Sequence, residues 1–238
     1  MPVHIKAEKE DIADMVIVGG DPARIEAMSD MLEDSKKVNA NRGFLVYTGS
    51  FKGKRMTLAC HGIGAPSIAI VVEELAELGA KYIVRFGTCG ALDANMDVGD
   101  LVVVTGASYA NGGTITQYMG HKLNGVALAQ TPDFELTQKI VDALHSKHMK
   151  FHMANAYSTD SFYSLSEDKA KELAEYGNSV VEMEAATLFM LGRAKGVKTA
   201  TLLMVSDNVI KHTKLFTHGE LEEKVRKVAA VLLEVLSK

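Results

Sequence analysis

The chain has 238 residues, of which 47% are hydrophobic and 24% charged, a composition that excludes predominant disorder, collagen-like repeats and low-complexity linkers. Its formal charge is −4 and its basic residues are dispersed, so we expect no nucleic-acid polymer as a partner. An anionic small-molecule substrate is compatible with this charge, because only the local charge of a site matters for such a ligand.

Apolar runs typical of buried strands alternate along the chain with the apolar spacing typical of helices. The strands predicted in this way are residues 15–18, 44–48, 55–59, 82–84, 101–105 and 199–205. The helices predicted between and after them are residues 22–32, 67–78, 134–148, 180–195 and 220–236. A turn at residues 49–53 predicts a hairpin between the second and third strands. Residues 106–132 contain five glycines without a clear period and are interpreted as a long irregular loop, often a functional feature in a compact domain.

This alternation predicts one α/β domain over residues 1–238, with a largely parallel or mixed central sheet flanked by helices. No apolar run reaches the roughly 20 residues that span a bilayer. The N-terminal stretch has no signal-peptide core, and the two cysteines, Cys60 and Cys89, fit a reducing compartment. We therefore expect a cytoplasmic protein. In open α/β sheets ligands bind at the carboxyl ends of strands, so the residues there are the first candidates for a site.

The first predicted strand is followed by a glycine turn that leads into a helix. Gly20 lies in this turn and Arg24 in the first turn of the helix. Free backbone N–H groups and the helix dipole favour an anion there, and a guanidinium suits phosphate geometry. The alternative is a plain strand-to-helix turn that carries a surface arginine.

An arginine also follows the strand predicted at residues 82–84. Arg85 is costly to bury unless it meets an anion, Gly87 lets a ligand approach the backbone, and the Thr88 hydroxyl can donate to a phosphate oxygen. The alternative is a buried ion pair with a protein carboxylate. We favour the ligand, because two strand ends in one chain combine arginine with glycine.

Two further strand or helix ends carry carboxylates. Glu182 and Glu184 lie at a predicted helix start, where they can accept the hydroxyls of a vicinal diol or simply favour the helix N-terminus. Ser206 and Asp207 end a hydrophobic strand, where a carboxyl group can act as a general acid or base or can cap a helix.

Histidines at helical spacing do not predict a metal site in this chain. His145, His148 and His152 are interleaved with lysines, which favours a solvated helix face, and the cysteines lack zinc-site spacing. We therefore expect no bound metal.

Taken together, these motifs resemble the nucleoside phosphorylase family, specifically the bacterial-type hexameric purine nucleoside phosphorylases. The resemblance spans nearly the whole chain in the same order. The matching segments are residues 2–5, 20–24, 41–43, 61–67, 85–90, 158–163, 181–186 and 205–207.

The resemblance implies an enzyme that transfers a pentosyl group from a purine nucleoside to orthophosphate, yielding a free base and a pentose 1-phosphate. Orthophosphate is then a co-substrate, and no cofactor or metal is implied. The residues that match the family's phosphate site are Gly20, Arg24, Arg42, Arg85 and Thr88. The residues that match its nucleoside site are His4, Phe162, Glu182, Met183, Glu184, Ser206 and Asp207.

Within these sets, the resemblance gives catalytic roles to Asp207, Ser206 and Arg85, with Asp207 as the acid toward purine N7. Phe162 would pack on the base. His4 and Arg42 resemble residues that a neighbouring subunit supplies, which implies a homo-oligomer, a hexamer built from dimers. The preferred purine nucleoside is not specified by the sequence.

The chain departs from the family after Asp207, where members often carry an arginine that assists proton delivery. Residues 208–220 contain none, and the next arginine is Arg226. The candidates that replace it are Lys211, His212, Lys214 and His218.

Three rival functions are weighed against purine phosphorolysis. A uridine phosphorylase reads its pyrimidine with a glutamine and an arginine that residues 164–168 lack, and it has no need of Asp207. A nucleosidase, which uses water, has no need of Arg24 and Arg85. A non-catalytic nucleoside-binding protein is at odds with a complete set of phosphate, ribose and base groups.

Overall fold

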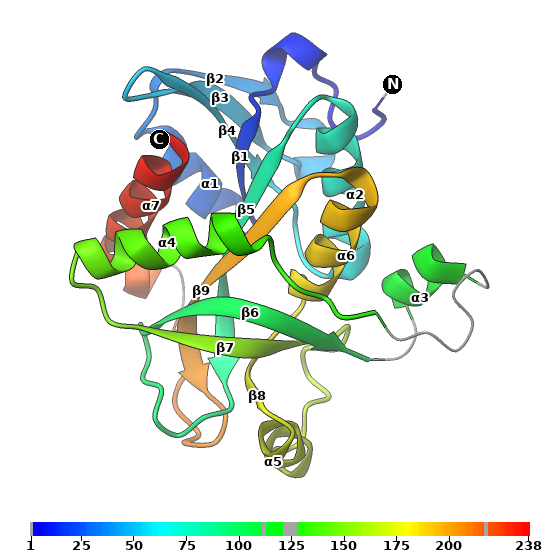
Figure 1. The fold of residues 1–238 in the computed structure, drawn as a ribbon, viewed down its shortest axis with the longest axis vertical. Helices are drawn as coiled ribbons and strands as arrows, with labels where there is room; N and C mark the ends of the chain where they lie inside the picture. The colour runs from blue at the N-terminus through cyan, green and yellow to red at the C-terminus, as the bar shows by residue number, and fades with distance from the viewer. Residues whose placement is uncertain (1, 111–112, 121–127, 217–218) are drawn as a thin grey trace.

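The computed structural model describes residues 2–110, 113–120, 128–216 and 219–238, which form one α/β domain (Figure 1). Its elements in chain order are η1 (Lys9–Asp11), β1 (Met15–Gly19), α1 (Pro22–Ser29), β2 (Glu33–Asn39), η2 (Asn41–Gly43), β3 (Val46–Phe51), β4 (Lys54–Cys60), α2 (Ala65–Glu77), β5 (Tyr82–Ala91), β6 (Leu101–Tyr109), α3 (Gly113–Met119), α4 (Phe134–Ser146), β7 (Phe151–Ser158), α5 (Glu167–Glu175), β8 (Asn178–Glu182), α6 (Ala185–Lys195), β9 (Lys198–Asn208), η4 (Gly219–Leu221) and α7 (Glu222–Leu236).

The central sheet is mixed. Its strands run in the order β2-β3-β4-β1-β5-β8-β7-β6-β9, and β9 also pairs with β5, so that five of the strands form a closed circuit. The pairs β1–β4, β1–β5, β5–β9, β6–β7 and β7–β8 are parallel, whereas β2–β3, β3–β4, β5–β8 and β6–β9 are antiparallel. The predicted α/β architecture with a mixed sheet and flanking helices is confirmed.

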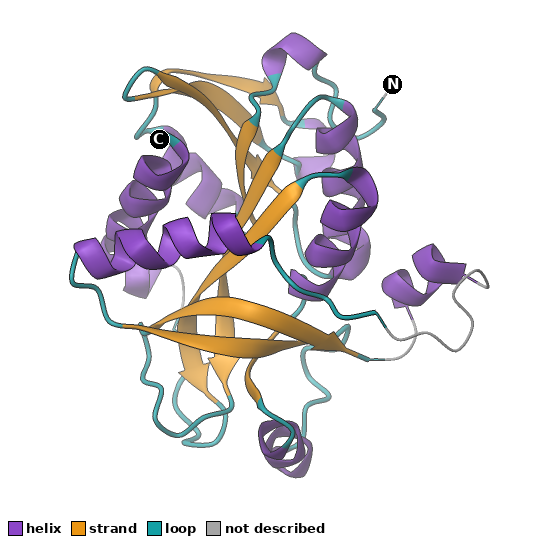
Figure 2. Ribbon diagram, in the orientation of Figure 1, coloured by secondary structure: helices purple, strands orange, loops and turns teal. Residues whose placement is uncertain are grey.

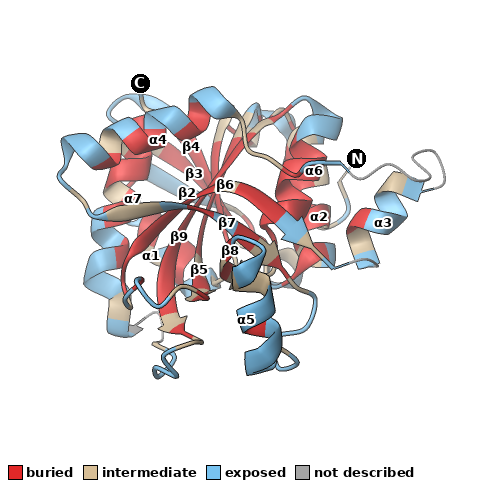
Figure 3. Ribbon diagram, turned by 60° about the horizontal axis from the view of Figure 1, so that its bottom comes forward, coloured by how far each residue is buried: buried red, intermediate tan, exposed pale blue. Residues whose placement is uncertain are grey.

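Helices cover both faces of this sheet (Figures 1 and 2). One buried cluster joins α2 and α6 to the sheet and includes Val16 and Val18, and the other joins α1, α4 and α7 to it and includes Ile17. Successive residues of β1 therefore point into opposite cores, which explains why its sequence is a continuous apolar run. Figure 3 shows buried residues along the central strands, while α5 presents mainly exposed ones.

The strands that carry the predicted site are longer than their apolar runs. β5 continues from Tyr82 to Ala91 and β9 from Lys198 to Asn208, so the site motifs lie inside strands rather than after them. The pairing persists through these positions, with Arg85 opposite Thr201 and Gly90 opposite Asp207. Polar residues and glycines lowered the apparent strand propensity there, but the backbone ladder does not depend on side-chain polarity.

Several elements differ from the sequence-based expectations. β2, β7 and α5 were not predicted, and residues 178–182 form strand β8 where the start of a helix was expected. The expected loop at 106–132 is wrong in part: residues 106–109 continue β6 and residues 113–119 form α3, while 111–112 and 121–127 lie outside the described residues. His152 belongs to β7, so the predicted helix face of three histidines does not exist.

The hairpin turn between β3 and β4 is also shorter than predicted. Phe51 pairs with Lys54, which leaves only Lys52 and Gly53 in the turn, both with positive φ. Positive φ at both turn residues gives a two-residue hairpin the backbone twist that matches its strands. In the ranges that the structure describes, no helix has the length and apolarity to cross a membrane.

Candidate active site

A cavity of about 590 Å³ opens where β1, β5, β8 and β9 end. Ten of the twelve predicted site residues line it, and the two others, His4 and Arg42, do not. The ten are Gly20, Arg24, Arg85, Thr88, Phe162, Glu182, Met183, Glu184, Ser206 and Asp207. Segments that are far apart in the sequence are therefore gathered around one cavity, as the strand-end argument predicted.

Arg24 brings a buried cation to one end of the cavity. The side chain is only 4% exposed, its Nη1 donates to the Phe86 carbonyl at 3.2 Å, and its guanidinium lies over the Phe86 ring. Burial lowers the pKa of Arg24 to about 10, with Asp21 opposing that shift and Arg85 adding to it. Arg24 therefore stays charged at neutral pH, and its Nε has no partner among the described residues.

Arg85 is fully buried and folds back over Gly87. Its Nη2 forms ion pairs with Glu184 and, at 3.3 Å, with Glu182. Burial would lower the pKa of Arg85, but the two carboxylates outweigh it and raise the pKa, so the guanidinium is charged. Its Nε and Nη1 have no partner among the described residues. The ion-pair alternative is thus realised at Nη2 of Arg85, while its Nε and Nη1 are left as donors that an anion can use.

Glu184 links Arg85 to the N-terminus of α2. Its Oε1 accepts the Gly64 N–H at 2.7 Å, directly before that helix, while its Oε2 meets Arg85. Burial would raise the pKa of Glu184, but the charge of Arg85 and the Gly64 N–H hold it below the usual value. The carboxylate is therefore ionised and oriented, and further lone pairs can accept hydroxyls.

Glu182 has its oxygens occupied by the chain itself. It accepts the N–H groups of Glu184 and Ala185 at 2.9–3.0 Å and the hydroxyl of Ser158. The Ser158 oxygen in turn accepts the Ala186 N–H at 3.0 Å. Glu182 and Ser158 thus accept the free N–H groups at the N-terminus of α6. The helix-capping alternative is therefore realised for Glu182, which also lines the cavity.

The opposite end of the cavity is less polar. The Ser206 hydroxyl lies 2.9 Å from Asp207 Oδ1 and 3.1 Å from the Cys89 carbonyl. Burial raises the pKa of Asp207, with the Ser206 hydrogen bond opposing it, which favours the neutral acid form. The apolar residues that line the cavity there and nearby are Phe162, Leu165, Val209, Leu215 and Phe216.

His4 and Arg42 lie together on the surface, away from the cavity. His4 Nδ1 bonds Glu74 at 2.8 Å, and its carbonyl accepts the Asn41 side chain at 3.0 Å, one residue before Arg42. Arg42 is exposed and has a φ of 54°. Their contribution to a neighbouring subunit stays a prediction, but the chain does bring their two segments into contact through Asn41.

His61 begins the matching segment 61–67, and its residue type alone predicts no role. It is fully buried, and neither ring nitrogen has a partner among the described residues. Burial lowers its pKa to about 4, so the ring is neutral beside Arg24, Arg85 and Glu184. A Cβ on Gly20 would lie 3.4 Å from its Cε1. The available signal was a histidine between the end of β4 and a glycine-rich helix start.

The candidates for the missing arginine have partners elsewhere. The ion pairs are Lys211–Asp97 at 2.8 Å, Lys214–Glu220 at 2.6 Å and His212–Glu167 at 3.5 Å. His218 lies outside the described residues. Among the described residues, no group of His, Cys, Asp and Glu side chains could hold a metal, and both cysteines are buried free thiols.

The phosphorylase superfamily model matches residues 14–238 of the chain. The chain belongs to this superfamily. Similar proteins include a guanosine phosphorylase from Halorubrum lacusprofundi, 35% identical over 87% of this chain and 83% of that protein. A DeoD-type purine nucleoside phosphorylase from Clostridium novyi is 36% identical over 99% of both chains. The crystal structure of uridine phosphorylase from Vibrio fischeri ES114 matches with a TM-score of 0.83 and 27% identity, over 98% of this chain and 96% of that one.

The position of the Arg85 guanidinium over Gly87 leads to a test in this superfamily member. A Cβ at Gly87 would overlap the guanidinium, so Gly87→Ala should expel it. Losing one charge-assisted contact costs about 1.5–3 kcal/mol, so the affinity for inorganic phosphate in calorimetric titrations should fall at least about tenfold.

Gly90→Ala is the matched control, because it lies on the same strand but faces Val181, Val209 and Asp207. It should leave phosphate affinity within about twofold of the wild-type value. Equal phosphate affinity in both variants would show that the free edge of Arg85 does not bind an anion.

Proposed function

We propose that the chain catalyses phosphorolysis of purine nucleosides, in which nucleoside and orthophosphate give a free purine and a pentose 1-phosphate. The observation that carries the proposal is one cavity that holds two kinds of group. Arg24 and Arg85 offer free donors, the latter beside Gly87 of β5, and Asp207, with a raised pKa, lies beside Gly90 of the same strand. Superfamily membership and the relatives named as purine nucleoside and guanosine phosphorylases support it.

The charges that develop in the reaction fit this arrangement. Cleavage of the C–N bond builds positive charge on the pentose and negative charge on the departing base. Phosphate held by Arg24, Arg85 and backbone N–H groups near Gly20 stabilises the first charge and then bonds to C1′. Glu184 would accept the pentose hydroxyls, and Asp207 would protonate N7 to relieve the charge on the base.

Purine is favoured over pyrimidine by the residues at the base end. The structural neighbour from Vibrio fischeri is a uridine phosphorylase, so the fold accommodates pyrimidine enzymes as well. This chain has neither glutamine nor arginine at residues 164–168, and it carries an acid that only a purine N7 requires. The two buried arginines likewise favour phosphate over water as the nucleophile.

The reaction itself can be tested by incubating the protein with inosine, with and without orthophosphate, and identifying the sugar product. We expect ribose 1-phosphate only when phosphate is present. Arg85→Ala should cost on the order of 2–4 kcal/mol of transition-state stabilisation, seen mainly in phosphate saturation. Equal cleavage without phosphate would identify a nucleosidase, and a folded protein that cleaves no nucleoside would be a binding protein.

Asp207→Ala should slow inosine phosphorolysis by about 10²–10⁴-fold, the usual contribution of general acid catalysis. A nucleoside methylated at N7 already carries the positive charge that protonation supplies, so the variant should cleave it with far less loss. The contrast isolates proton transfer, because a folding defect depresses both rates. An equal loss on the two substrates would make Asp207 a binding or structural residue.

We further propose that active sites are shared between neighbouring subunits of a homo-oligomer. The proposal is supported by the position of His4 and Arg42, which lie together outside the cavity although their motifs match the family's substrate sites.

Arg42→Ala and Asp207→Ala chains, each inactive alone, should regain partial phosphorolysis when they are refolded together. A mixed oligomer contains cavities with an intact Asp207 that receive Arg42 from the other chain. The measurement is specific activity against the mixing ratio, with mass spectrometry to verify mixed oligomers. Mixed oligomers without activity would refute the sharing.

A further inference from the structure

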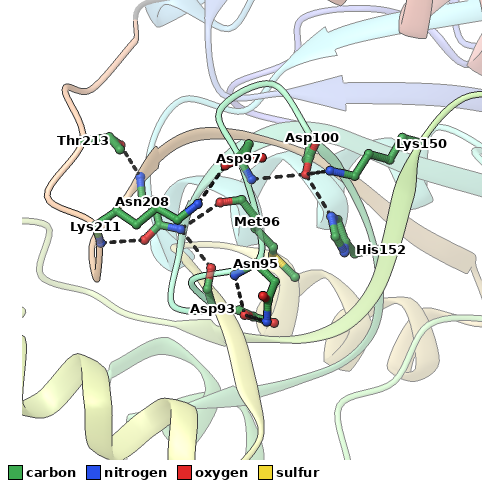
Figure 4. A network of polar contacts seen from close by, with 10 residues as sticks. All are labelled: Asp93, Asn95, Met96, Asp97, Asp100, Lys150, His152, Asn208, Lys211 and Thr213. Carbon is green, nitrogen blue, oxygen red and sulfur yellow. Dashed lines mark hydrogen bonds and ion pairs between the residues drawn. The ribbon is translucent and has the colours of Figure 1, made fainter.

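The chain folds back on itself directly after Asp207, and Asn208 is the pivot. Asn208 is 1% exposed, and its side-chain amide donates to the carbonyl groups of Asp93 at 2.8 Å and Met96 at 2.9 Å (Figure 4). Its Oδ1 accepts the Lys211 N–H at 2.9 Å. Both donors and the acceptor of one buried side chain are therefore used to join the β5–β6 connection to the turn after β9.

Backbone hydrogen bonds close the same turn. The Asn208 N–H donates to Thr213 Oγ1 at 2.6 Å, and the Thr213 N–H returns to the Asn208 carbonyl at 3.1 Å. Farther along, the Phe216 N–H donates to the Ser206 carbonyl at 2.9 Å. The segment 209–216 thus lies against the end of β9, and it supplies Val209, Leu215 and Phe216 to the cavity.

The outer part of this network is made of ion pairs. The buried carboxylate of Asp100 meets Lys150 at 2.8 Å and His152 at 2.9 Å, whereas Lys211 Nζ lies 2.8 Å from Asp97 in an exposed pair (Figure 4). A solvent-exposed pair such as Lys211–Asp97 contributes little to stability. By contrast, a buried amide whose three hydrogen bonds are all made is costly to disrupt. Asn208 therefore holds the segment more firmly than Lys211 does.

We propose that Asn208 is a positioning residue for the reaction, a clamp that holds the 209–216 segment in place and thereby aligns Asp207 with the base. The inference rests on the proposed function. Asn208 adjoins Asp207 in the chain, and its own contacts lie outside the cavity. It therefore acts on the reaction by positioning Asp207 and the apolar wall of the cavity formed by Val209, Leu215 and Phe216, without touching the substrate. Phosphate, which would bind near Gly20 and Arg85, lies at the other end and is independent of the clamp.

The test compares Asn208→Ala and Asn208→Asp with the matched control Lys211→Met. Aspartate keeps the size of asparagine but cannot donate to the Asp93 and Met96 carbonyls, whereas Lys211→Met removes the exposed ion pair and keeps the backbone N–H. We expect both Asn208 variants to lose about 10–100-fold in kcat for inosine and to raise its KM several-fold, because small misplacements of a reacting group are this costly. The KM for phosphate should stay within about twofold, and Lys211→Met should resemble the wild type.

Cleavage of an N7-methylated nucleoside separates alignment from mere stability. If the clamp aligns the acid, the Asn208 variants lose at least about fivefold less on this substrate than on inosine, since no proton is needed. Equal losses on both substrates, or a parallel loss of phosphate affinity, would overturn the proposal. If the Asn208 variants fail to fold, Thr213→Val, at an exposed position, removes the hydroxyl that receives the Asn208 N–H, and it must show the same pattern in milder form.

Binding measurements keep this test apart from the test of the proposed function. Calorimetric titration with hypoxanthine, and separately with inorganic phosphate, requires no turnover. The Asn208 variants should weaken hypoxanthine binding several-fold and leave phosphate binding unchanged. If the wild-type protein binds both ligands but does not catalyse phosphorolysis, the proposed function is wrong. The binding comparison between the wild type and the Asn208 variants still tests whether Asn208 positions the base-binding residues. Unchanged hypoxanthine binding together with unchanged kcat would overturn this positioning role.

Discussion

A guanidinium buried in the middle of a sheet is the constraint around which the rest of this structure is arranged. Arg85 cannot leave water without compensation, and Glu184 and Glu182 supply it. Each carboxylate also meets the N-terminus of a helix, Glu184 at α2 through Gly64 and Glu182 at α6. One ion-pair cluster therefore fixes how two helices dock on the strands that end at the cavity.

The same cluster is the basis for the proposed phosphate site. The carboxylates take up Nη2 of Arg85 and leave its Nε and Nη1 free, and Arg24, a second cation, has an unpartnered Nε nearby. Buried donors without partners are unfavourable until a ligand with several acceptor oxygens arrives. His61 adds no charge here, because burial keeps its ring neutral. The proposed phosphate would supply acceptors to these buried donors.

The sequence allowed the grouping of the candidate residues to be predicted better than the bounds of the strands that carry them. Ten of the twelve candidates line one cavity, because neighbouring strands of an α/β sheet end at one edge; the roles of these residues stay predictions. The strands themselves were underestimated, since Gly87 and Asp207 look like terminators although the ladder continues through them. β7 was not predicted because His152 and Asn155 interrupt its apolar run, and its exposed positions include Met153 and Asn155. The partnership of Arg85 with Glu184 spans 99 residues, a distance that no local pattern reveals.

The proposed roles require a charged Arg24 and a neutral Asp207, and burial is compatible with both. Burial lowers the pKa of Arg24 only to about 10, so the cation survives at neutral pH. The same desolvation raises the pKa of Asp207, where the neutral form is the one that can give a proton. An acid of this kind acts below its raised pKa and is lost as the pH climbs through it, while the arginines remain charged. Among the described residues, desolvation rather than a neighbouring arginine is thus the cause of the raised pKa of Asp207, and Leu215 and Phe216 line the same cavity. This is why the placement of these two apolar residues, and of Asn208, which fixes the turn before them, bears directly on the proposed protonation of the base.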